Sequence, residues 1–170
     1  MSKRNLKKYL LELNKSQLED QIIELYDKFK EVKVYYDFVF NPKEKNLVKD
    51  AKLKITNEYF PTTGRKAKMR RSTAQKFIKQ FIVLGVDDFI IADIMLYSIE
   101  IAQALCSEKE IKQEAFYKSL LNTYNQSIKF MIEKGILADF KSRVEGVKIK
   151  SYEQNWINKQ EFNILLDKLY

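Results

Sequence analysis

The sequence predicts an all-α protein, an irregular multi-helix bundle of about seven or eight helices, with a stack of helical hairpins as the alternative arrangement. Three observations favour this class: repeated helix-start signals, long apolar stripes with helical spacing, and only four glycines and two prolines in 170 residues. Scarce glycine and proline disfavour a turn-rich β fold. Because a chain of this length can bury a sizeable core, we expect residues 1–170 to form a single helical domain.

Several helices are expected to begin at capping boxes, in which an N-cap residue is followed three positions later by Glu or Gln. The N-cap residues of these boxes are Ser16, Asn41, Ser72, Ser107 and Asn158. Together with the apolar spacing, they predict helices near 3–13, 16–40, 43–60, 72–84, 88–106, 108–134, 137–144 and 158–169. Residues 147–152 alternate in polarity, so we expect an extended link there.

The helix expected over 88–106 is the most apolar and should lie at the centre of the fold. Asp93 and Glu100 interrupt its apolar run, which argues against a membrane span, so no membrane partner is predicted. The only cysteine, Cys106, lies in this run and is interpreted as a buried thiol in a reducing compartment. The N-terminus lacks the apolar stretch of a secretory signal, and we therefore expect a cytoplasmic protein.

The chain contains no histidine, which removes the commonest general base and the usual imidazole ligands of metals. Phosphate loops, dinucleotide fingerprints and Cys-x-x-Cys motifs are also missing from the sequence. The sequence therefore predicts no catalytic residue, no metal and no cofactor.

Positive charge is concentrated in one segment: between Tyr59 and Val86 there are seven cations and no acid, in a chain whose formal net charge is +8. Three of the five arginines fall within residues 65–71, and a guanidinium can donate two parallel hydrogen bonds to a phosphate or carboxylate. An anion at the Ser72 and Thr73 amides would offset the repulsion between the arginines and the helix start. The candidate anion-binding residues are Arg65, Lys66, Lys68, Arg70, Arg71, Ser72, Thr73, Lys76 and Lys79.

Internal pairing is the alternative explanation of this basic loop, because residues 81–116 carry a net charge of −5 and offer an acidic helix on which it could dock. On that helix Asp93, Tyr97 and Glu100 share one face. The two carboxylates fit acid–base catalysis or the binding of a divalent cation. Alternatively, they form a structural ion pair with Arg65, Arg70 or Arg71. We favour the ion pair.

Three stretches carry a family resemblance: Ser2-Lys-Arg-Asn-Leu-Lys-Lys-Tyr-Leu, Tyr35-Tyr-Asp-Phe-Val-Phe-Asn-Pro-Lys-Glu, and Glu58-Tyr-Phe-Pro with the basic loop that follows it. Through them most of the chain resembles an uncharacterised bacterial family, domain of unknown function 6155. The resemblance implies a bacterial cytoplasmic origin and transfers no catalytic residue.

The function expected from the residues is a non-catalytic helical binding module whose basic loop at 65–79 takes an anionic partner such as nucleic acid. The alternative is a helical protein–protein interaction scaffold whose loop charges are paired internally. An enzyme that uses Asp93 and Glu100 is the third hypothesis.

Overall fold

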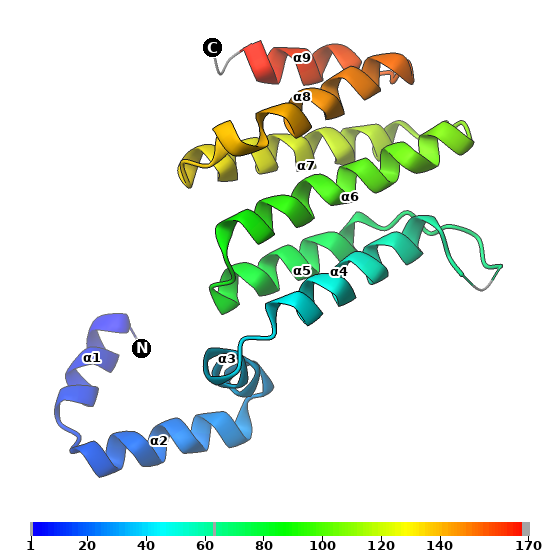
Figure 1. Cartoon of the computed structure of the whole chain (residues 1–170). Coiled ribbons are helices and arrows are strands. Elements are labelled where there is room, and N and C mark those ends of the chain that lie inside the picture. The colour runs from blue at the N-terminus through cyan, green and yellow to red at the C-terminus, as the bar shows by residue number, and fades with distance from the viewer. Residues whose placement is uncertain (1, 63, 168–170) are drawn as a thin grey trace. The chain divides into compact units, whose positions relative to one another are not determined.

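The computed structural model describes residues 2–62 and 64–167, and within them the chain forms nine helices and no strand (Figure 1). The predicted all-α, multi-helix fold is confirmed. The helices are α1 (Lys3–Leu11), α2 (Lys15–Lys28), α3 (Lys30–Phe40), α4 (Glu44–Tyr59), α5 (Arg71–Leu84), α6 (Asp88–Glu108), α7 (Glu114–Glu133), α8 (Leu137–Glu153) and α9 (Lys159–Asp167).

The contacts along the chain divide it into two compact units, Met1–Lys43 and Glu44–Tyr170. The first unit holds α1, α2 and α3, and the second unit holds the other six described helices. Whether the two act as the single domain expected from the sequence stays a prediction.

The core of the second unit is built around α6, which lies between α4 and α5 on one side and α7 and α8 on the other (Figure 1). Ile94, Leu96 and Ile99 on this helix are fully buried. Against α7 and α8 packs α9, whose Phe162 ring lies 4.9 Å from that of Tyr124 and 5.5 Å from that of Trp156. Among the described helices, α6 alone has the length and apolar character of a membrane span. More than half of its most apolar stretch is buried inside the structure. The prediction that this helix is central is confirmed.

The long helix expected over 16–40 is two helices, because the backbone becomes extended at Phe29 (φ −119°, ψ 113°). The Phe29 amide closes α2 on the Leu25 carbonyl, and the Phe29 carbonyl accepts the amides that open α3. Across this bend the Tyr26 hydroxyl donates a 2.8 Å hydrogen bond to the Asp37 carboxylate. The apolar stripe continues through the bend, which is why its spacing alone predicted one helix.

The extended link expected over 147–152 is wrong, since α8 runs through it to Glu153. Val144, Val147 and Ser151 lie buried on one face of α8, so packing against the core overrides the alternating pattern. The Val147 carbonyl also accepts a 2.8 Å hydrogen bond from the side-chain Nε2 of Gln103 in α6.

The capping boxes expected at Ser107 and Ser16 are wrong, and at both places the helix end moves. At Ser107 the helix continues to Glu108 and the hydroxyl donates to the Gln103 carbonyl, so α7 begins only at Glu114. Near Ser16 the box is formed instead by Asn14 with Gln17. Ser and Asn side chains accept the hydrogen bond at an N-cap about equally well, so either of two neighbouring residues can be the N-cap of the helix.

Candidate anion-binding site

The basic loop joins α4 to α5 and folds back onto the last turn of α4. The backbone amides of Lys68 and Met69 both donate to the Glu58 carbonyl, each at 2.9 Å. Met69 takes a left-handed backbone conformation, with φ +53°, and this turns the chain toward α5. One residue near the end of α4 therefore anchors the far end of the loop.

The Glu58 carboxylate holds the same end of the loop by its side chain. Arg70 donates to it through Nε and Nη2, both at 3.1 Å, and the Thr73 hydroxyl donates at 2.9 Å. The Glu58 side chain is only 11% exposed. Burial alone would raise the pKa of this carboxyl, but the hydrogen bonds from Arg70 and Thr73 outweigh it and hold the pKa below its ordinary value.

The start of α5 differs from the expected capping box at Ser72. The helix begins at Arg71, and Arg70 occupies the N-cap position without a side-chain cap bond. The carboxylate of Glu58, bonded to Thr73 in the first turn, places a negative charge at the positive end of this helix. Thus the chain itself supplies an anion where the sequence led us to expect a bound one.

The predicted docking of the loop on the acidic helix is wrong for both arginines at the helix start. The acidic partner of Arg70 is Glu58 in α4, and the half-buried Arg71 donates from Nη1 to the Ser119 carbonyl of α7 at 3.3 Å. These two arginines stabilise the junction between helices. They are less available to an outside ligand than the sequence suggested.

A hollow of about 260 Å³, here called the basic hollow, lies beside this junction. Arg65, Lys66 and Lys68 are exposed at it, and none of them forms an ion pair within the described part of the chain. With the Arg70 charge offset by Glu58, the hollow keeps three uncompensated positive charges. Its lining residues are Asn57, Glu58, Pro61, Thr62, Arg65, Lys66, Lys68 and Arg70.

The remaining predicted residues lie on α5 outside this lining. Ser72, Lys76 and Lys79 are exposed. Since residues three apart on a helix are neighbours, Lys76 follows Thr73 along one face and Lys79 follows Lys76. The structure therefore gathers four of the nine predicted residues around one hollow, and two more continue the positive charge along α5.

The second predicted cluster, Asp93 and Glu100, forms an ion pair with a residue that the sequence analysis did not name. Arg143 of α8 donates from Nε and Nη2 to Glu100 at 2.9 and 2.8 Å, and from Nη1 to Asp93 at 2.8 Å. The other Asp93 oxygen lies 2.7 Å from Lys52 Nζ of α4. These hydrogen bonds raise the pKa of Arg143.

An ion pair is confirmed for these carboxylates, and the expected partners Arg65, Arg70 and Arg71 are wrong. Those arginines belong to the loop before α5, whereas Arg143 lies on α8, which packs directly against α6. All four carboxylate oxygens of Asp93 and Glu100 have a cationic partner, so the arrangement is that of a structural network. Within residues 2–62 and 64–167, no group of three or more acidic or thiol side chains is placed to hold a metal ion.

Comparison with known proteins identifies a family. The family model of DUF6155, a family of unknown function, covers residues 1–170. This chain belongs to the DUF6155 family. No curated protein and no solved structure matches it.

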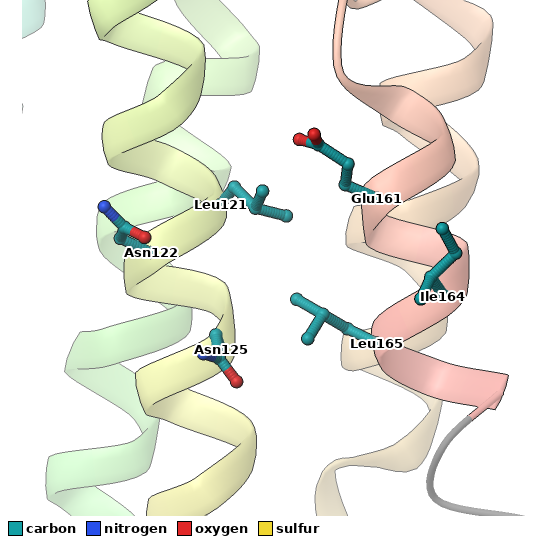
Figure 2. A pocket seen from close by; sticks show the side chains of 6 residues that line it. All are labelled: Leu121, Asn122, Asn125, Glu161, Ile164 and Leu165. Atoms are coloured by element: carbon teal, nitrogen blue, oxygen red, sulfur yellow. The ribbon is translucent and has the colours of Figure 1, made fainter.

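Two further hollows of this DUF6155 protein offer less chemistry. Between α7 and α9 a hollow of about 180 Å³ is lined by Asn122, Asn125, Ile164 and three residues that Figure 2 shows projecting into the gap, Leu121, Glu161 and Leu165. It is apolar apart from one carboxylate and two amides. A hollow of about 300 Å³ includes Cys106, but burial raises the pKa of that thiol to about 11, so it stays protonated near neutral pH.

Sequence reasoning missed Asn57, Glu58, Pro61 and Thr62 as parts of the DUF6155 hollow. Glu58 precedes Arg70 by 12 residues, and nothing in their spacing indicates that a left-handed turn at Met69 brings them together. The usable signal was that Glu58 is the last acid before the acid-free stretch. A lone carboxylate beside seven cations is the natural internal partner of one of them.

Proposed function

We propose that this protein is a non-catalytic helical module that binds an anionic partner, nucleic acid, through Arg65, Lys66 and Lys68 at the basic hollow. One observation carries the proposal: three exposed cations surround one hollow, and its only acid, Glu58, is already used by Arg70. Mutual repulsion among uncompensated cations costs free energy, and a bound polyanion would remove that cost.

Phosphate is the anion that suits these residue types. An exposed guanidinium binds phosphate through paired hydrogen bonds, and two lysines beside it add point charges. Lys76 and Lys79 would extend contact along α5 beyond the hollow, which favours a polymer with repeated phosphates over a single small anion. We infer phosphate-backbone contacts and no base-specific ones.

The proposal excludes catalysis as the main role because the Asp93–Glu100 cluster has its carboxylate oxygens bonded to Arg143 and Lys52. A general base must come within hydrogen-bond reach of the substrate proton, and here Arg143 and Lys52 already occupy that position at both carboxylates. We also place the function in the cytoplasm and away from membranes. That choice is supported by the free thiol of Cys106, which suits a reducing compartment, and by the use of α6 as a core helix.

The test is fluorescence anisotropy of labelled single-stranded and duplex nucleic acid with two variants of equal charge change. The first is Arg65→Ala/Lys66→Ala/Lys68→Ala, and the control replaces three exposed lysines elsewhere by alanine, namely Lys112, Lys118 and Lys129. We expect the first variant to weaken binding at least tenfold more than the control. Equal weakening by both variants, or no binding by the wild type at low salt, would reject the basic hollow as the site.

A second candidate function is a helical protein–protein interaction scaffold. It is favoured by the first unit, whose helices leave large apolar side chains exposed. This function requires no contact at the basic hollow. It predicts that the triple loop variant keeps its protein partner while nucleic-acid affinity, if any, is lost.

A further inference from the structure

The first unit lacks a core of its own. None of its described residues, 2–43, is buried, whereas the second unit buries apolar residues on every one of its described helices. At least two-fifths of each of the following side chains in the first unit is exposed: Leu6, Tyr9, Leu11, Ile22, Ile23, Leu25, Phe29, Tyr35, Val39 and Phe40. These apolar residues come from all three helices of the unit.

Helices of this length do not persist on their own in water. α1 has 9 residues, α2 has 14 and α3 has 11, and isolated helices shorter than about 12–15 residues are marginal even in favourable sequences. A segment of about 40 residues usually needs disulfides, metals or oligomerisation to fold. The first unit contains neither a cysteine nor a histidine, so a disulfide or an imidazole-bound metal cannot stabilise it, and its exposed apolar side chains fit oligomerisation.

The charges of the first unit are divided between its helices. α1 carries Lys3, Arg4, Lys7 and Lys8 and no acid, which gives it +4. α2 carries four acids and two lysines, which gives it −2. Its lysines already pair within the helix, Lys15 with Glu19 and Lys28 with Glu24, and Asp20 and Asp27 form no ion pair in the described chain.

Each of the two helices therefore carries an excess of one sign of charge, and on α1 the like charges lie close together. On α1, Lys3 faces Lys7 and Arg4 faces Lys8, each four residues apart, and such pairs destabilise a helix. A surface that carries both a basic and an acidic helix can pair with a second copy of itself. If a two-fold axis relates the copies, the basic helix of each copy meets the acidic helix of the other.

We propose that residues 2–43 are a self-association arm that pairs with a second copy of this chain, α1 of each copy lying against α2 of the other. The apolar side chains of α1 and α2 form the centre of the contact, and the basic and acidic residues form its rim. Hydrogen bonds from Gln21 to the Tyr9 hydroxyl (2.5 Å) and from Tyr26 to Asp37 hold the face in shape before the copies meet. The proposal does not depend on nucleic-acid binding.

The first test measures the dimer dissociation constant of the full chain by sedimentation velocity. Ile22→Glu puts a charge into the centre of the contact and should raise the dissociation constant tenfold or more, a loss of about 1.4 kcal/mol or more at one central apolar residue. Val83→Glu makes the same kind of change at an exposed residue of α5 and should leave the dimer intact. A wild-type protein that stays monomeric up to high concentration would overturn the proposal.

The second test separates self-association from a merely structural role of the charges. Reversing α1 with Lys3→Glu/Arg4→Glu/Lys7→Glu/Lys8→Glu changes its charge from +4 to −4 and should abolish the dimer, and so should reversing α2 from −2 to +2 with Asp20→Lys/Asp27→Lys. Mixing the two variants should restore it as a heterodimer, because the acidic α1 of one then meets the basic α2 of the other and the remaining pair, an unchanged α1 with an unchanged α2, is also opposite in charge. If the mixture stays monomeric while both variants keep wild-type circular dichroism, the proposed pairing is refuted.

Discussion

Removing Arg143 tests whether Asp93 and Glu100 are structural. The variant Arg143→Met keeps an unbranched apolar stem and removes the guanidinium, whose carbon lies 5.8 Å from the centre of the Phe140 ring. It deletes all three hydrogen bonds to the two carboxylates. Asp93 still has Lys52, but Glu100 loses its cation.

The expected cost follows from the exposure of the network. Breaking a fully buried ion pair costs about 3–5 kcal/mol, and an exposed pair contributes about 1 kcal/mol or less. The side chains of Arg143, Asp93 and Glu100 are 34%, 29% and 35% exposed. Screening by water therefore makes the cost of breaking this network smaller than that of a fully buried ion pair. We expect Arg143→Met to lower the free energy of unfolding by about 2 kcal/mol, an intermediate value.

Urea denaturation followed by circular dichroism measures this loss. The double variant Arg143→Met/Glu100→Gln should recover part of it, since the carboxylate left without a cation is then gone; the coupling between the two sites should be about 1 kcal/mol or more. Lys52→Met, which leaves both carboxylates with Arg143, should cost less than Arg143→Met. Strict additivity of the Arg143 and Glu100 changes would show that the ion pair contributes nothing to stability.

Further predictions concern the loop anchor, the thiol and the core. Glu58→Gln should destabilise the protein at neutral pH, and because the wild-type carboxyl has a lowered pKa, the difference in unfolding free energy should shrink as the pH falls below about 4.5. The same change frees Arg70 and should steepen the salt dependence of nucleic-acid binding by about 0.7 to 0.9. Cys106 should react with a thiol reagent near neutral pH much more slowly in the folded protein than in urea, as measured by absorbance, since its pKa is about 11. Phe81→Ala, at a fully buried site, should cost about 3–5 kcal/mol in urea denaturation.

The helices of this protein could largely be predicted from local patterns. The α6 segment is the most apolar part of the chain and was expected to be central, and the faces of α5 and α7 follow the helical period. Such patterns depend only on residues that are close in the sequence, so they can be recognised without knowing the fold. Helix ends were less predictable, because Asn14 and Ser16 offer equivalent caps two residues apart.

The bend at Phe29 and the length of α8 could not be predicted, and for opposite reasons. At Phe29 a continuous apolar stripe hides a break that is held by contacts between Tyr26 and Asp37. In α8, Gly146 and the alternating residues after it suggest an end, but the buried Val147 and Ser151 keep the helix going. In both cases tertiary contacts outweigh local preference.

What the structure revealed beyond the sequence is mainly the partners of these residues that lie far away in the chain. The sequence placed Asp93, Tyr97 and Glu100 on one face, and the structure agrees: Tyr97 shares a 2.6 Å hydrogen bond with Thr56 of α4. It did not predict Arg143, which is 43 residues beyond Glu100. Choosing among 31 cations for each acid requires the order in which helices pack, and periodicity does not provide that order.

Phosphate binding at the basic hollow is tested by the salt dependence of nucleic-acid binding for the wild type and for Arg65→Ala/Lys66→Ala/Lys68→Ala. Each phosphate contact contributes about 0.7 to 0.9 to the slope of log affinity against log salt, so loss of three contacts should flatten the slope by about 2 to 3. The variant with alanine at Lys112, Lys118 and Lys129 should keep the wild-type slope. Parallel slopes for the wild type and the loop variant would show that Arg65, Lys66 and Lys68 make no phosphate contact and that the basic hollow is not the binding site.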